Sequence, residues 1–275
     1  MQKRIIAINS NTYHGFSLDD ALEGIKAAGF HHIELTATKG WTEHVFPNMS
    51  FEELWRIKDK LHDYEIEPIS MSGHCNLMDQ ERIADFIANM RLANFFGCTY
   101  ITSSVGEAHI KDKAHASNKE VAEHLKRLLP HLEKYDLILG LENHGEHSTC
   151  AIIEEIVDAV GSERVKINFD TANGILYAGK EPVEDMRSCA AKIGHLHLKD
   201  KAGADNEWNF PALGDGHVDF PTIFGLLEGN NAPASIEIEF TSKGPGSLAE
   251  VDEAVRKSGE YLRRIGALQA GLLID

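Results

Sequence analysis

The segment LILGLENHG, residues 137–145, is apolar for most of its length and ends in Glu142, Asn143 and His144. Short β-branched or aliphatic runs of this kind alternate along the chain with longer segments of helical periodicity, which is typical of parallel strands joined by crossover helices. In a closed barrel built this way, the carboxyl ends of the strands form the active face. The segment therefore indicates both the fold class and the place of a site.

The same alternation extends along the whole chain. We predict eight strands, at Ile5–Ser10, His32–Thr36, Glu67–Met71, Tyr100–Ser103, Leu137–Glu142, Val165–Asp170, His195–Leu198 and Ser235–Glu239. Eight units would average about 34 residues each, which suits a single (β/α)8 TIM barrel over residues 1–275 and leaves no room for a second domain. An open doubly wound sheet is the alternative, but no GxGxxG motif follows the first strand.

Several predicted helices have recognisable ends. Ser17, Ser50 and Ser148 each precede a helical segment and are predicted to cap it. Gly29 and Gly97 stand where a helix would end, because glycine tolerates the left-handed backbone found there. These ends divide the chain into units of the length that a barrel requires.

Composition excludes several kinds of partner. The formal net charge is −16 and no basic patch interrupts it, so we expect no nucleic-acid partner. No apolar run approaches the roughly 20 residues of a membrane span, so we expect no membrane partner. The N-terminus lacks the zones of a signal peptide, and Cys75, Cys98, Cys150 and Cys189 form no CxxC pair. Free thiols and a cytoplasmic location are therefore expected.

Four successive strands end in residues that commonly bind metal ions: Glu142, Asp170, His197 and Glu237, spaced 28, 27 and 40 residues apart. A lone acid at a strand end is more often a helix cap or an ion-pair partner, but four on consecutive strands favour a metal site. Three carboxylates and one imidazole suit one divalent ion, with Mn²⁺ preferred and Mg²⁺, Co²⁺ and Zn²⁺ as alternatives. Glu239 is the alternate to Glu237, because strand alternation places both on one face.

Further polar residues near these strand ends are predicted to contact a substrate. They are His74, Asn143, His144, Asn173, His195, Lys199 and Glu34. His195 and Lys199 share a strand face with His197. The structural alternatives are a cap for His74, a satisfied core residue for His195 and a buried ion pair for Glu34.

At these residues the chain resembles the xylose isomerase-like barrels, a superfamily of sugar-phosphate isomerases and epimerases that also contains endonuclease IV. The resemblance runs from the first strand to about Gly266 and rests on AGFHHIEL, GLENHG, NFDTAN, GHLHLKD, LGDGHVDF and SIEIEF. It implies that the four strand-end residues bind the metal, with Glu237 of SIE as the ligand on the last strand. It also implies a homodimer or homotetramer.

The chain departs from endonuclease IV at ligands for two further metals. Asn173 stands where that enzyme's pattern has a histidine, and Trp208 and Phe210 stand where it has an Asp-x-His element. Together with the acidic charge, these departures make DNA repair an unsuitable function for the chain.

The resemblance implies proton transfer next to a carbonyl. In the sugar isomerases and epimerases of the superfamily a metal holds adjacent oxygens while two glutamates exchange a proton, and here Glu142 and Glu237 would be that pair. We predict an isomerase or epimerase that acts through an enediolate on a free sugar or polyol derivative, since no phosphate cradle is evident. One alternative is a lyase or dehydratase on a keto-inositol or 3-keto-glycoside. A non-catalytic sugar-binding barrel is an alternative of another class.

Overall fold

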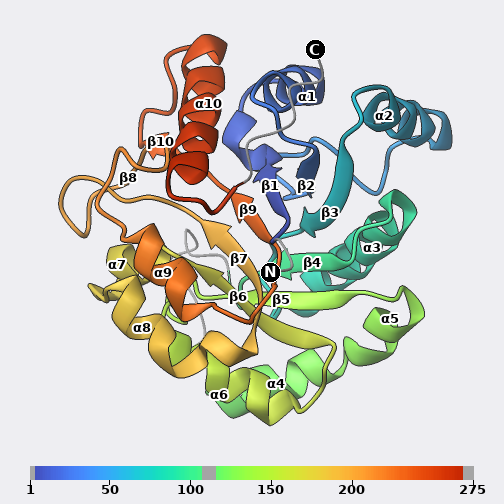
Figure 1. Ribbon diagram of the computed structural model, residues 1–275. Helices are drawn as coiled ribbons and strands as arrows, with labels where there is room; N and C mark the ends of the chain where they lie inside the picture. Colours follow the sequence, from blue (N-terminus) through green and yellow to red (C-terminus); the bar gives the residue numbers. More distant parts are fainter. Residues whose placement is uncertain (1–3, 107–115, 269–275) are drawn as a thin grey trace.

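Eight parallel strands close into a barrel in the order β1-β2-β3-β4-β5-β6-β7-β9, with helices around it (Figure 1). The structure, a computed structural model, describes residues 4–106 and 116–268. The barrel strands are β1 Ile6–Asn9, β2 His32–Thr36, β3 Glu67–Ser72, β4 Tyr100–Ser103, β5 Ile138–Glu142, β6 Val165–Asp170, β7 Ile193–Leu198 and β9 Ala234–Ile236. The predicted (β/α)8 TIM barrel is confirmed.

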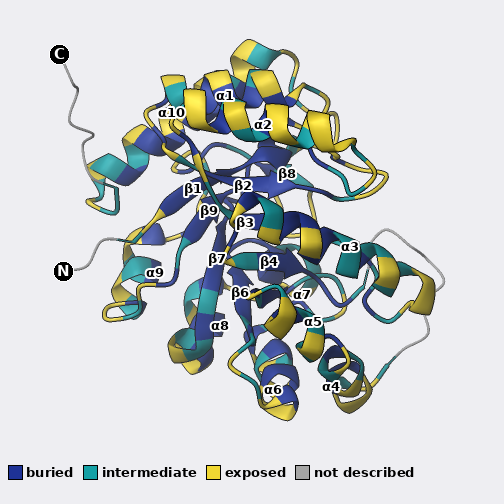
Figure 2. Cartoon of the chain, turned by 90° about the vertical axis from the view of Figure 1, so that its right-hand side faces the viewer, coloured by how far each residue is buried: buried dark blue, intermediate teal, exposed yellow. Residues whose placement is uncertain are grey.

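Helices cover the outside of the barrel. They are α1 Leu18–Ala27, α2 Phe51–Asp63, α3 Gln80–Phe96, α4 Asn118–Lys126, α5 Leu129–Lys134, α6 Cys150–Val160, α7 Asn173–Ala178, α8 Pro182–Cys189, α9 Phe220–Leu226 and α10 Leu248–Arg264. Their exposed residues face outward, as α1 and α2 show clearly, while the strands are almost wholly buried (Figure 2). Among the helices in the described ranges, none has the length and apolarity that a membrane crossing requires.

Two of the three predicted serine caps form as expected. Ser17 and Ser50 each accept a hydrogen bond from the backbone N–H three residues on, at 3.2 Å in both cases. The cap predicted at Ser148 is wrong, because α6 begins at Cys150 and its N-cap is Thr149, which makes no side-chain cap bond. Ser148 instead lies buried beside the turn that closes between residues 144 and 147, and its carbonyl accepts a bond from Asn143.

The last barrel strand is shorter than predicted. The barrel ladder stops at Ile236, and Phe240 turns the chain with a left-handed φ of 57° into β10 (Phe240–Thr241). β10 pairs antiparallel with β8 (Asn209–Phe210) in a two-stranded sheet that the sequence did not predict, because two-residue strands show no periodicity. Glu237 therefore stands directly after the barrel strand, at the rim of the barrel.

Two of the cysteines are joined. Cys150, the first residue of α6, and Cys189, the last of α8, form a disulfide, with Cα atoms 6.2 Å apart. The expectation of free thiols is wrong for this pair. The two residues are 39 positions apart, so their spacing gives no signal, and only the packing of α6 against α8 brings them together.

Candidate active site

Four side chains from consecutive barrel strands converge at the carboxyl ends of those strands. Glu142 ends β5, Asp170 ends β6, His197 lies near the end of β7, and Glu237 follows β9. One ligand atom from each lies within 4.8 Å of the others, and all four residues are buried. The structure thus brings together the four residues predicted to bind a metal, and it includes Glu237 rather than Glu239 in the set.

The donor set fits one divalent ion. Oδ1 of Asp170 accepts hydrogen bonds of 2.8 Å from the backbone N–H groups of Ala172 and Asn173. Oδ2 is buried and accepts no hydrogen bond from the described residues, although the Lys199 ammonium is in ion-pair range at 3.2 Å. A buried carboxylate oxygen without a hydrogen bond lowers the stability of the folded protein. A hard cation at this position would satisfy that oxygen, and a set of three carboxylates and one imidazole suits such an ion.

Lys199 balances part of the negative charge. Its ammonium lies 3.2 Å from Asp170 Oδ2, 3.0 Å from Glu237 Oε2 and 3.0 Å from Glu239 Oε2. Burial alone would lower the pKa of Lys199, but the surrounding carboxylates outweigh it and hold that pKa well above its usual value. Lys199 therefore stays charged at the edge of the four-residue set, where it can also contact a substrate.

His74 and Glu142 form a pair that faces the cavity. Nε2 of His74 lies 2.9 Å from Oε2 of Glu142, and Nδ1 lies 2.9 Å from Oγ of Ser72. Burial opposes ionisation of both groups, yet Glu142 raises the pKa of His74, while His74 and His197 together hold the pKa of Glu142 well below its usual value. A carboxylate and an imidazole proton donor thus stand side by side.

The two glutamates of the last strand differ in proton affinity. Asn9 and Asn11 donate hydrogen bonds to Oε1 of Glu237, at 3.2 and 3.0 Å, and Lys199 outweighs burial to lower the pKa of that residue. Burial raises the pKa of Glu239 to about 7. Glu237 is therefore held as a carboxylate, whereas Glu239 titrates near neutral pH.

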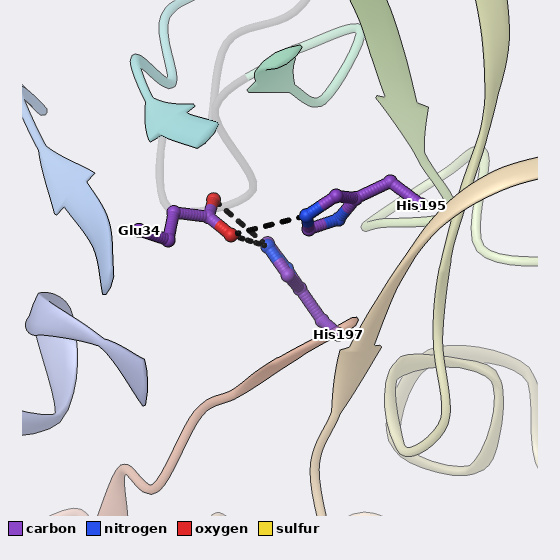
Figure 3. A group of neighbouring side chains, drawn as sticks. All are labelled: Glu34, His195 and His197. Carbon is purple, nitrogen blue, oxygen red and sulfur yellow. Dashed lines mark hydrogen bonds and ion pairs between the residues drawn. The ribbon is translucent and has the colours of Figure 1, made fainter. Parts of the chain in front are cut away.

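Four of the predicted substrate contacts lie behind the cavity wall. Glu34 and His195 are fully buried against His197 (Figure 3). Asn143 ties β5 to β6, because its side chain accepts from the backbone N–H of Asp170 and donates to the carbonyl of the same residue. Asn173 is the buried first residue of α7. These four do not line the cavity, whereas the predicted contacts His74, His144 and Lys199 do.

The cavity above the four-residue set has a volume of about 330 Å³. Its walls include Trp41, Trp208 and Arg82, none of which the sequence analysis named as a site residue. Trp41 is fixed in place, since its ring stacks on His14 at 4.3 Å and its indole N–H donates to Asn11 at 3.0 Å. Neither tryptophan is at a strand end, and Arg82 is on a helix, so no strand-end pattern marks them.

A second cavity of about 410 Å³ adjoins the first. The two share Asn11, Trp41, Trp208 and Glu239, and the outer one continues along the segment from Ile238 to Pro245. Space for a ligand therefore extends past the two tryptophans, away from the four-residue set.

Comparison with known proteins gives a family and a group of related enzymes. A family model described as a xylose isomerase-like TIM barrel matches residues 22–265. An inosose dehydratase of Clostridium botulinum is 28% identical over 135 residues, 42% of this chain and 43% of that protein. The match thus spans less than half the length of the first curated relatives. An inosose dehydratase of Mesomycoplasma hyopneumoniae is 24% identical over 279 residues, 90% and 89% of the two chains.

Solved structures share the fold. A D-psicose 3-epimerase determined in the presence of D-fructose superposes with a TM-score of 0.77 at 16% identity, over 96% of this chain and 99% of that one. An IolI protein with a bound zinc atom gives 0.76 at 17% identity, with the same coverage. At these identities the likeness is evidence for the barrel alone.

Proposed function

The chain belongs to the xylose isomerase-like TIM-barrel family, and we propose that it is a divalent-metal-dependent lyase acting on a polyhydroxylated cyclic ketone, with a keto-inositol as the first choice. The reaction would break the C–H bond next to the ketone and the C–O bond one carbon further on, form a C=C bond, and release water. The observation that carries this proposal is the pairing of Glu142 with His74 at 2.9 Å, at the cavity above the four-residue set.

Glu142, Asp170, His197 and Glu237 would hold the ion, which supplies positive charge against the negative charge that develops on the substrate. Glu142 would remove the proton next to the ketone. His74, beside it, would donate a proton to the departing oxygen, because a hydroxide leaves poorly without one. Since the two groups are neighbours, both would act on the same side of the ring, which makes the elimination syn.

The cavity suits a ligand of this size and kind. A volume of about 330 Å³ is at the small end of ligand pockets, which begin at roughly 300 Å³. Trp41 and Trp208 offer apolar surface to the C–H face of a ring, while Asn11 and Lys199 offer donors to its oxygens. Inosose dehydratases among the relatives, including the two named above, support the same substrate class. A 3-keto-glycoside is the alternative substrate, with its leaving group in the adjoining cavity.

An epimerase or isomerase is the second candidate. Asn9, Asn11 and Lys199 hold Glu237 in place, and Glu142 and Glu237 would exchange one proton between them. This candidate needs no proton donor for a leaving group, so it gives His74 no chemical task.

Incubation with Mn²⁺ in D₂O, followed by NMR and mass spectrometry, tests both candidates. We expect a keto-inositol to lose the mass of water, and we expect this loss to vanish with EDTA and in Glu142→Gln. His74→Gln should keep some exchange of the substrate proton while losing elimination. The exposed Glu163→Gln is the matched control and should behave as the wild type. Exchange of the substrate proton on ketoses without loss of water would favour the epimerase, and the absence of both exchange and water loss on every substrate would refute both.

A further inference from the structure

His197 faces two carboxylate environments with its two ring nitrogens. Nδ1 lies 2.5 Å from Oε1 of Glu142 and 3.7 Å from Oε2 of Glu237, on the side of the ligand set. Nε2 lies 3.1 and 3.2 Å from the two oxygens of Glu34, on the opposite side. Figure 3 shows the Glu34 carboxylate meeting both histidines of β7. Each nitrogen therefore has a distinct partner, which fixes the plane of the ring.

Glu34 is sealed inside the barrel. Its oxygens accept hydrogen bonds from Thr102 Oγ1 at 2.7 Å and Ser70 Oγ at 3.0 Å, and His195 Nε2 lies 3.6 Å away. All of these residues are fully buried, and they come from strands β2, β3, β4 and β7. Because so many strands contribute, the position of the carboxylate is set by the barrel itself and not by a loop.

Glu34, His195 and His197 are also close enough together to hold a second metal ion. Their hydrogen bonds favour a different role. Each oxygen of Glu34 already accepts a hydroxyl proton, and a metal ligand must present an unprotonated nitrogen, so an ion here would cost the bond between Nε2 of His197 and Glu34. The Glu34 carboxylate is thus placed to accept a proton of the His197 imidazole in a hydrogen bond.

We propose that Glu34 is a positioning residue: it takes the Nε2 proton of His197 and so turns the Nδ1 lone pair toward Glu142, Asp170 and Glu237. A histidine ligand is usually oriented by the partner of its second nitrogen, which fixes the tautomer and makes the first nitrogen a better ligand. This inference rests on the metal position in the proposed function. Glu34, predicted from the sequence as a substrate contact, instead orients a ligand of the metal.

Metal affinity measured by chelator competition with Zn²⁺ tests the role of Glu34. We expect one ion per chain in the wild type and in Glu34→Gln, with binding about tenfold to a hundredfold weaker in the variant. Thr102→Val is the matched control, because it removes a bond to the same carboxylate but keeps the charge, and its affinity should stay close to that of the wild type. Equal affinity in Glu34→Gln would overturn the proposal, as would a fall from two ions to one.

An NMR measurement on the wild type covers the case in which Glu34→Gln does not fold. In protein labelled with ¹⁵N at histidine and loaded with Zn²⁺, we expect Nδ1 of His197 to carry the metal-bound shift and Nε2 to carry a proton. Metal on Nε2 would overturn the proposal. A wild type that binds no Zn²⁺ would refute the metal site as a whole, whereas binding that is indifferent to Glu34 would refute this inference alone.

Discussion

Carboxylates lie on both sides of His197, but those on one side have fewer hydrogen bonds than the carboxylate on the other. Toward the cavity, Asp170 keeps a buried oxygen that accepts no hydrogen bond from the described residues, and it is surrounded by further acids. Toward the interior, both oxygens of Glu34 accept bonds from hydroxyl groups and from the imidazole of His197. Buried polar groups in proteins are normally hydrogen-bonded. The cavity side, where an oxygen of Asp170 accepts no such bond, is therefore the position for a ligand. The side of Glu34, called the sealed side below, has a structural role.

The carboxyl groups on the two sides also differ in how readily they ionise. Burial and the neighbouring acids Glu142 and Glu237 raise the pKa of Asp170, which means that its charged form is disfavoured in the metal-free protein. Burial also disfavours the charged form of Glu34, but the two histidines outweigh it and lower the pKa of the carboxyl group. On the cavity side Asp170 therefore lacks a compensating positive charge that a bound cation would supply, and local penalties of this kind are common at functional sites.

The largest effect is expected for Asp170→Asn. The variant keeps an oxygen for the two backbone bonds that Asp170 accepts, but it loses the charge offered to the ion. We expect affinity for Mn²⁺ or Zn²⁺ to fall by more than about a hundredfold, beyond the usual cost of losing a supporting residue. Metal-free Asp170→Asn should melt no lower than the wild type, because a disfavoured charge has been removed.

Chelator competition and thermal unfolding check both parts. Asp185→Asn is a matched control: Asp185 is a buried aspartate that accepts a bond from the backbone of Cys150 and does not line the cavity. It should leave metal affinity unchanged. Wild-type affinity in Asp170→Asn would remove Asp170 from the ligand set and weaken the contrast between the two sides.

A smaller effect, on stability and not on the metal, is expected for Thr102→Val. The hydroxyl of Thr102 lies 2.7 Å from Oε1 of Glu34, and valine has nearly the same shape. Losing a hydrogen bond to a buried charged group costs about 2 kcal/mol. Urea unfolding of the metal-free protein should show that loss, and an unchanged unfolding free energy would mean that the sealed side is less completely bonded than its geometry indicates.

The sequence predicts the fold well because the barrel repeats one unit. Alternation of apolar runs with helical segments is a local pattern, and it identifies all eight barrel strands to within a few residues. The two-stranded sheet of β8 and β10 and the disulfide between Cys150 and Cys189 were not predicted. Both depend on which segments meet in space, and neither a two-residue strand nor a separation of 39 residues carries that information.

The sequence predicts which residues lie together better than it predicts how far each lies from the cavity. Strand alternation assigns His195 and His197 to the same face, but inward side chains of a barrel form layers, and the alternation does not say which layer meets the cavity. His197 lies in the layer beneath the cavity, and His195 and Glu34 lie deeper. Trp41 and Trp208 were not named as site residues, because they reach the cavity from outside the barrel strands and the strand-end pattern does not include them.

The smallest effect is expected at His195, which lies beside Glu34 on the sealed side of His197. Burial lowers its pKa to about 4, because Glu34 does not fully offset the loss of solvent. An unfolded histidine titrates near 6.5, so as the pH falls from about 6.5 toward 4 the unfolded chain binds a proton that folded His195 does not, and stability decreases. Above that window His195 is neutral in both states and stability does not depend on its titration.

His195→Gln removes this proton linkage while keeping a side chain that can bond to Asn168, the partner of His195 Nδ1 at 3.0 Å. Between pH 7 and pH 5.5 the metal-free wild type should lose roughly 1 kcal/mol more unfolding free energy than the variant, as measured by urea unfolding at each pH. Equal losses would mean that folded His195 accepts the proton. Glu34 would then be shared between two imidazolium groups, and its bond to His197 would no longer set the orientation of that ring by itself.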